Sequence, residues 1–395
     1  MDRTTFRKAL EEAFAVCPPE SAPSYALPIM MHHAESRSEK ADPRFVSLLE
    51  ELRSQPDLEI FNDQMQVLAG QSTRTSFSSL ASWLLKRTSS KGLDVAVADL
   101  DRYVAANELP CTLTLALTGI TTDVTRDMGR DIYLVPWDSL PYSSQKQSIH
   151  ERIFFDPFHM STCAIIRAFT IPKLHINPTT YDGNLLRIPD DTELHDAVRC
   201  FSLVGPSAPQ VIAEWVALPE WAPHLGGSMS LFHIEGFFSP NRALSEADYQ
   251  QVHDLFHQFI SRPAAFQAHL RVPMDRLNRA MRRMTPVDAF IDLGIALESL
   301  YLADMDDDRG ELTFRLRVRA ARFLRTDTED RAAVFDLVRD IYGVRSAAVH
   351  TGKVDITVRG RPVQELLQDG CSLTADTLRR FISDGEPDWK SIILQ

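Results

Sequence analysis

The sequence has few cysteines and no long apolar run, and both absences limit the kind of protein it encodes. The five cysteines are odd in number, far apart and never form a C-x-x-C pair: Cys17, Cys111, Cys163, Cys200 and Cys371. This argues against a disulfide framework or a zinc knuckle and favours a reducing cytoplasm. No run approaches the ~18 apolar residues that span a bilayer, and the charged N-terminus lacks the apolar core of a signal peptide. We therefore expect a cytoplasmic protein without membrane contact.

Motifs of metal and nucleotide chemistry are also missing. There is no phosphate-cradling glycine loop and no nucleophile elbow. His253 and His257 are four residues apart, but no nearby cysteine completes a zinc site. The acidic run 304–311 resembles a calcium loop, yet its glycine falls one place late and Arg315 stands where the loop needs glutamate. The sequence therefore predicts no metal and no cofactor.

Length and composition predict a globular protein of more than one domain. The chain has 395 residues, 44% hydrophobic and 24% charged, which is too long for one ordinary core. The net charge of −12 gives no global attraction to nucleic acid, so any RNA contact needs a local basic patch.

The spacing of apolar residues changes twice along the sequence and predicts an α+β multidomain protein. Residues 1–105 read mainly as helices, with helical apolar spacing at 45–53 and 79–87. Residues 106–242 look β-rich and either form one domain with the preceding segment or stand apart. Their expected strands lie within 111–120, 130–142, 163–174, 210–222 and 229–238.

Residues 243–395 predict an all-α bundle. Ser245 is followed three residues later by Asp248, which is the pattern of a helix N-cap. The expected helices lie at 244–260, 273–284, 286–303, 311–324, 328–342 and within 362–382.

Two features of this bundle suggest a site. Residues 271–350 hold fourteen arginines, no lysine and fourteen acidic residues. Arg315, Arg319 and Arg322 follow helical spacing, so they form either a phosphate-binding stripe or a solvated face. Glu298 lies in an apolar helical stretch, where it either meets a cation or reaches water at the edge of a groove.

The stretch "GVRSAAVHTG" holds an arginine and a histidine whose chemistry suits RNA. Imidazoles titrate near neutral pH, so His350 can move the proton of a ribose 2′-hydroxyl. The Arg345 guanidinium can stabilise a pentavalent phosphorane without a metal. Five helical residues turn the two about 140° apart, so one copy presents the pair poorly and a two-fold dimer would join two pairs in one cleft. The alternative is a histidine that caps the helix before Gly352.

Three marks in order resemble the Apea-like branch of the HEPN superfamily: "ALESL", "RVRAA" and "IYGVRSAAVH". The resemblance covers about 245–395. It implies a helical bundle that dimerises through the motif face and cleaves RNA without metal, commonly as a toxin or effector of bacterial anti-phage defence by abortive infection.

By matching residues, the resemblance implies that Arg345 and His350 are catalytic and that Glu298, Arg319 and Ser346 support them. Arg315 and Arg322 are candidate RNA contacts. Gly352 replaces a tyrosine whose nucleotidylation controls some members, so we do not expect that control. The N-terminal part then senses a phage-derived or protein trigger, holds the nuclease inactive or selects RNA. The alternative function is a non-catalytic HEPN module for dimerisation or nucleotide binding in a larger assembly.

Overall fold

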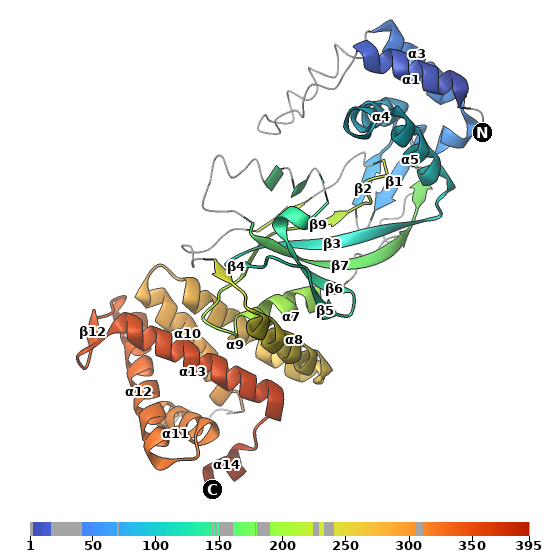
Figure 1. Cartoon of the computed structure of the whole chain (residues 1–395). Coiled ribbons are helices and arrows are strands. Elements are labelled where there is room, and N and C mark those ends of the chain that lie inside the picture. The colour runs from blue at the N-terminus through green and yellow to red at the C-terminus, as the bar shows by residue number, and fades with distance from the viewer. Residues whose placement is uncertain are drawn as a thin grey trace.

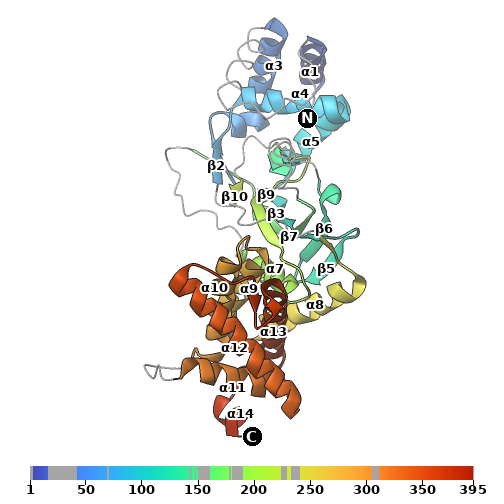
Figure 2. The same ribbon diagram turned by 90° about the vertical axis from the view of Figure 1, so that its left-hand side faces the viewer.

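The computed structural model describes residues 3–16, 42–68, 71–141, 143, 145–146, 148–149, 161–177, 179, 190–223, 229–232, 241–304 and 311–394. The molecule is elongated, with helices at each end and a sheet between them, and its termini lie at opposite ends (Figures 1 and 2). The predicted α+β class is confirmed, because the sheets lie in the N-terminal half and helices fill the C-terminal half.

The described residues of the N-terminal end, which we name the cap, form four α-helices, a 3-10 helix and a small sheet. Its helices are α1 (Thr4–Val16), α3 (Pro43–Ser54), η1 (Pro56–Phe61), α4 (Phe77–Lys91) and α5 (Leu93–Ala105). The helices predicted at 45–53 and 79–87 are confirmed as parts of α3 and α4. The region also contains a hairpin that helical spacing did not predict. Its antiparallel sheet has the order β2 (Gln71–Arg74), β1 (Met65–Leu68), β8 (Leu174–Ile176).

A six-stranded antiparallel sheet forms the middle of the molecule. Its order is β10 (Ser230–Leu231), β9 (Gln210–Ala217), β3 (Glu108–Thr118), β7 (Cys163–Pro172), β6 (Ile132–Pro136), β5 (Arg126–Gly129). The strands predicted within 111–120, 130–142, 163–174 and 210–222 are therefore confirmed. Of 229–238, only 229–232 are described, and they contain the short β10. After β6 comes η2 (Trp137–Ser139), and the parallel pair β4 (Ile120–Thr121) and β11 (Arg242–Ala243) joins the sheet to the helices beyond it.

Strand β3 links the two ends of the molecule through alternate side chains. Near its start, Leu109 and Cys111 pack into the core of the cap. Farther along, Leu113, Leu115 and Leu117 pack into the core that contains the C-terminal helices. Because strand side chains alternate between faces, Ala116 packs instead in a third cluster with Trp137 and Trp215, among others. One strand of 11 residues thus contributes to all three cores.

Helix α7 (Thr192–Phe201) interrupts the region that we predicted to be β-rich. It packs between β7 and the helices α8 and α9. Its buried apolar side chains follow helical spacing, a signal obscured by the strands on both sides: Leu194, Ala197, Val198, Cys200 and Phe201.

The C-terminal helices form the predicted all-α bundle. They are α8 (Glu246–Ser261), α9 (Ala264–Arg282), α10 (Pro286–Tyr301), α11 (Leu312–Leu324), α12 (Thr328–Thr351), α13 (Val363–Asp384) and α14 (Trp389–Leu394), with a hairpin of β12 (Thr357–Val358) and β13 (Arg361–Pro362). The predicted N-cap of helix α8 is confirmed, because Ser245 and Asp248 form a reciprocal capping box. Whether this bundle is a HEPN domain stays a prediction.

One predicted helix bound in the bundle was wrong. Helix α9 starts at Ala264 rather than near Pro273, which lies buried inside it. There, packing of a buried face overrides the local signal of an internal proline. The helix predicted at 328–342 continues through the arginine–histidine stretch to Thr351 and ends before Gly352. The helix predicted within 362–382 is confirmed as α13. None of the described helices combines the length and the apolar character needed to span a bilayer.

Candidate active site

Helix α12 carries both predicted catalytic residues in its C-terminal third. The helix is capped at its start by Asp327, whose carboxylate accepts a 2.8 Å hydrogen bond from the backbone N–H of Glu329. It ends at Gly352, which adopts a left-handed conformation with a φ of 65°. Glycine adopts this conformation without strain because it has no Cβ. His350 therefore lies in the last turn of a helix with a defined end.

Arg345 packs against helix α10, where Gly294 leaves room for its side chain. A Cβ atom at position 294 would collide with Cγ of Arg345. Four residues farther along the same face of α10, Glu298 receives the guanidinium: Nη2 lies 3.1 Å from one carboxylate oxygen and donates to the other at 3.2 Å. The Arg345 side chain keeps 24% of its surface exposed. It is oriented by the protein and accessible to a ligand at the same time.

Tyr342 completes the support of this arginine. Its hydroxyl donates a 2.8 Å hydrogen bond to Glu298, and its ring lies 5.3 Å from the guanidinium carbon of Arg345. Burial, followed by the neighbouring Glu298 carboxylate, raises the pKa of Tyr342 to about 12, so the hydroxyl stays protonated and donates at neutral pH. Glu298 is thus an acceptor for two groups of α12. Both interpretations of Glu298 are partly realised, since it meets a cation and remains 30% exposed.

His350 is exposed to solvent, and the residues before it differ in accessibility. Ser346 and Ala347 are at least partly exposed, but Ala348 is buried in the core at 2% exposure. The buried Ala348 therefore leaves no room for a ligand at its position. The geometric expectation for the pair remains: one continuous helix turns Arg345 and His350 about 140° apart.

Arg319 does not belong to this cluster, contrary to its predicted role beside the arginine–histidine pair. It is 8% exposed and donates a 2.6 Å hydrogen bond to the carbonyl of Tyr301. Its guanidinium also pairs with Asp304 and lies 4.9 Å from the ring centre of Trp389. These contacts tie α11 to the end of α10 and to α14. Arg319 therefore supports the bundle rather than the Arg345–Glu298 pair.

The predicted arginine stripe is not one surface, because its middle member Arg319 lies in the interior. Arg315 and Arg322 are each partly buried. The three guanidinium groups do not line up towards solvent, so a phosphate-binding row of three is excluded. Contact of Arg315 or Arg322 with RNA individually stays a prediction.

Two sequence patterns resemble metal sites: the pair His253 and His257, and the acidic run 304–311. The rings of His253 and His257 lie 4.4 Å apart, and His257 packs against Gly129. Of the acidic run 304–311, residues 305–310 lie outside the described residues, and Asp304 pairs with Arg319. Within the described ranges, one group of three potential ligands converges, and it is elsewhere: Asp191, His195 and Glu214.

The sequence did not reveal why Arg345 has a fixed orientation. Gly294 was visible as a helical neighbour of Glu298, and Tyr342 lies one turn before Arg345, but only the packing of α10 on α12 joins them. The available signal was a glycine inside a helix of otherwise strong helix formers. Such a glycine lowers helix stability by about 1 kcal/mol relative to alanine, so its presence suggests that another group packs closely against it.

Comparison of the chain with protein-family models, with curated proteins and with solved structures finds no match.

Proposed function

We propose that this protein is a metal-independent endoribonuclease of the HEPN type, with Arg345 and His350 as its catalytic residues. The observation that carries the proposal is the state of Arg345, whose guanidinium is held by Glu298 yet partly exposed, near a helix end that presents an exposed histidine. Gly294 leaves room for the side chain of Arg345, and the Glu298 carboxylate fixes its orientation. Catalysis benefits from such preorganisation, because no reorganisation is then needed during the reaction.

The proposed reaction is an intramolecular transesterification of the RNA backbone. The ribose 2′-oxygen loses its proton to a histidine and attacks the adjacent phosphorus, while the 5′-oxygen leaves and receives a proton from a protonated histidine. The products are a 2′,3′-cyclic phosphate and a 5′-hydroxyl, and no water is consumed. Nη2 of Arg345 binds Glu298, and the side chain keeps 24% of its surface exposed, so we propose that the guanidinium also contacts a phosphate oxygen.

A two-fold dimer through the end of α12 is part of the proposal. Val349 is 49% exposed beside His350, and Ile356, in the connection that follows the helix, is 85% exposed. Apolar side chains at this helix end suit a surface covered by a second copy. In such a dimer, Arg345 of one copy and His350 of the other would share a phosphate.

The assembly is testable with engineered cysteines in a Cys17→Ser background, because Cys17 lies outside the described residues and the other four cysteines are buried. Val349→Cys should form a disulfide-linked dimer on mild oxidation. Val272→Cys on α9 is the matched control, since Val272 is also 49% exposed. Non-reducing electrophoresis compares both with the parent chain. Equal cross-linking of the two variants would exclude this interface.

The chemistry is tested by incubating the purified protein with RNA in EDTA and identifying the ends produced. We expect cyclic phosphate and 5′-hydroxyl ends, and no cleavage where the ribose is 2′-deoxy. His350→Ala should reduce cleavage by about 10²–10⁴-fold, and Arg345→Ala by about 10²–10³-fold, with little loss of stability for the histidine because it is exposed. His253→Ala is the control histidine.

Mixing the two inactive variants tests the composite site. An Arg345→Ala copy still supplies His350, and a His350→Ala copy still supplies Arg345, so each mixed dimer contains one intact pair. After random exchange, half of the dimers are mixed and activity should return to about a quarter of the unmodified level. Failure of the mixture, together with metal-dependent products or none, would favour the alternative of a non-catalytic dimerisation or nucleotide-binding module.

The cap and the central sheet complete the proposal as the regulatory part. A toxin or effector of anti-phage defence in the cytoplasm must stay harmless until a trigger arrives, and residues 1–242 are the part that the nuclease chemistry does not use. We propose that a phage-derived or protein trigger acts there.

A further inference from the structure

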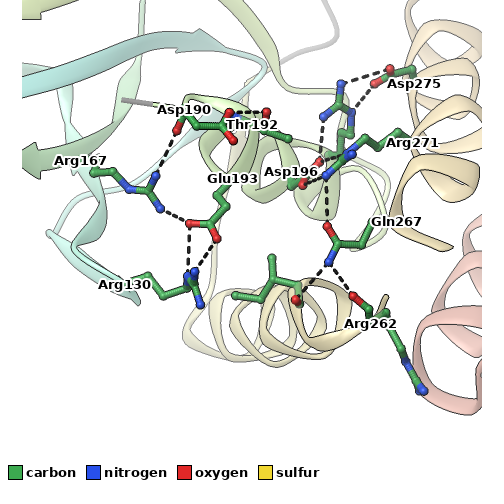
Figure 3. A network of polar contacts seen from close by, with 12 residues as sticks. Arg130, Arg167, Asp190, Thr192, Glu193, Asp196, Arg262, Gln267, Arg271 and Asp275 are labelled. Atoms are coloured by element: carbon green, nitrogen blue, oxygen red, sulfur yellow. Dashed lines mark hydrogen bonds and ion pairs between the residues drawn. The ribbon is translucent and has the colours of Figure 1, made fainter. Parts of the chain in front are cut away.

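Helix α7 begins within a network of charged residues in which almost every carboxylate has an arginine partner (Figure 3). Glu193 pairs with Arg130 and Arg167. Asp196, which is fully buried, accepts from Arg199 at 2.9 Å and from both ends of the Arg271 fork at 2.9 and 2.7 Å. Such pairing is what buried and half-buried carboxylates require.

Two carboxylates beside this network are exceptions. Asp191 lies at the start of α7, and Glu214 lies on β9 with its side chain 15% exposed. Within the part of the chain that the structure describes, the one basic side chain within 4.0 Å of either carboxylate is His195, which is shared between them. Its Nε2 atom lies 3.6 Å from Asp191 and 3.8 Å from Glu214, too far for a hydrogen bond to either. Two negative charges therefore converge on one imidazole that binds neither.

The three ligand atoms have the spacing of a metal site. All lie within 4.8 Å of one another. Two ligands about 2.1 Å from a tetrahedral ion are ~3.4 Å apart, so the separations of 3.6 and 3.8 Å from His195 need a few tenths of an ångström of contraction. The two carboxylates, which lie within 4.8 Å of each other, approach by up to ~1.4 Å when they bind the same ion. Asp191 and His195 are four residues apart on one helix, and the third group comes from a distant strand, which is a common way to build a chelate.

We propose that Asp191, His195 and Glu214 bind a divalent transition-metal ion, and we take Zn²⁺ as its representative. One imidazole with two carboxylates favours such an ion over Mg²⁺ or Ca²⁺, which prefer oxygen ligands alone. The two carboxylates also balance its charge. Three protein ligands leave a coordination position open, and His195 lines a cleft of about 230 Å³ that admits solvent.

The ion would join two elements that meet at the boundary between the sheet and the bundle. Asp191 and His195 are fixed to α7, which packs on α8 and α9, whereas Glu214 is fixed to β9 of the sheet. Occupancy therefore ties the start of α7 to the sheet. A ligand that binds only the folded state stabilises it, so the melting temperature of the full chain rises with metal concentration.

The test uses the full-length protein after treatment with EDTA and removal of the chelator. Titration calorimetry with Zn²⁺ should show one site per chain whose affinity falls at least tenfold in His195→Ala and in Glu214→Gln. The second variant keeps the shape of the side chain and removes its charge. His253→Ala is the matched control, because His253 also lies beside an aspartate, at 3.3 Å. Excess Mg²⁺ should not compete.

A second readout separates this site from other histidines. Co²⁺ bound in place of Zn²⁺ should give visible absorption bands that disappear in His195→Ala and persist in His253→Ala. The rise in melting temperature with Zn²⁺ should follow the same pattern. Zn²⁺ binding of equal affinity and stoichiometry in His195→Ala, Glu214→Gln and the unmodified chain would overturn the proposal. The outcome is independent of the proposed ribonuclease, since RNA cleavage is expected to persist in EDTA.

Discussion

Two buried polar networks, one in the cap and one in the bundle, differ in charge. The network in the cap is neutral: the Gln66 amide donates to the Tyr103 hydroxyl at 2.7 Å, and that hydroxyl lies 2.8 Å from Nε2 of His175. The network in the bundle is charged: Asp292, which is 2% exposed, accepts 2.7 Å hydrogen bonds from Arg276 and Arg283.

This difference determines what each region tolerates. A neutral hydrogen-bonded chain stays stable until one member gains a charge, whereas a buried carboxylate stays stable until a partner is lost. The cap should therefore be sensitive to acid, and the bundle to substitutions that unbalance its charges. The proposed active site lies in the region whose folding already depends on oriented arginines.

The largest effect on stability is expected for Asp292→Ala. Removing the carboxylate leaves the positive charges of Arg276 and Arg283 close together between α9 and α10, without the negative charge that both bind. Breaking a buried pair costs about 3–5 kcal/mol, and the partial exposure of both arginines places this variant near the lower value. Urea denaturation measures the loss, with Asp254→Ala on the exposed face of α8 as a control that should change stability by less than about 0.5 kcal/mol. Equal stability of the two variants would remove the contrast between the regions.

Acid should weaken the cap through His175. Burial lowers the pKa of His175 to about 4 from 6.5. Since the folded state binds the proton less readily, its stabilising contribution is complete above pH 6.5 and is lost as the pH falls from 6.5 towards 4, amounting to about 2–3 kcal/mol. His175→Gln removes the titration, so its stability should change less over this pH interval. Parallel pH profiles for the two proteins would contradict the assignment.

Gly294→Ala should separate activity from stability in the bundle. The new Cβ displaces Arg345, so RNA cleavage should fall at least tenfold, whereas the helical preference of alanine, about 1 kcal/mol, offsets the lost contact. Gly343→Ala on α12 is the matched control, since a Cβ there meets nothing within 4 Å. That control should be stabilised by up to about 1 kcal/mol and remain active. Full activity of Gly294→Ala would mean that the position of Arg345 is not catalytic.

The smallest effect on stability is expected for Glu298→Gln. The variant keeps an acceptor for Tyr342 and removes the ion pair with Arg345, which is partly exposed and therefore contributes about 0.5–1 kcal/mol. Cleavage should nevertheless fall, because the guanidinium loses its fixed partner. Melting curves and cleavage rates on the same preparations measure both effects. Unchanged cleavage would make Glu298 a surface residue without influence on the site.

Local patterns predicted what local forces determine. The Ser245–Asp248 capping box and the alternating leucines of β3 follow from contacts within a few residues, and both are confirmed. The partner of Arg319 was not predictable. Glu298 lies on α10 and Asp304 lies just beyond its end, so both acids are near in sequence. Only the angles at which α11 and α12 cross α10 decide that Arg319 pairs with Asp304 and Arg345 with Glu298.

The convergence of Asp191, His195 and Glu214 was equally hidden. Its helix was not recognised among the strands around it, and Glu214 approaches only because β9 lies beside β3 in the sheet. The pairing of strands that are distant in the sequence cannot be deduced from the spacing of hydrophobic residues.

The shared role of β3 limits how this protein can be divided or recombined. Leu113, Leu115 and Leu117 belong to the same apolar core as Phe256 and Phe259 of α8. A fragment that starts near residue 243 would leave the α8 and α9 faces uncovered and prone to aggregation, so the bundle cannot be moved by itself to another protein. Shuffling of such domains would have to carry β3 and α7 along. Mechanical force or local melting in the sheet should likewise reach the bundle directly.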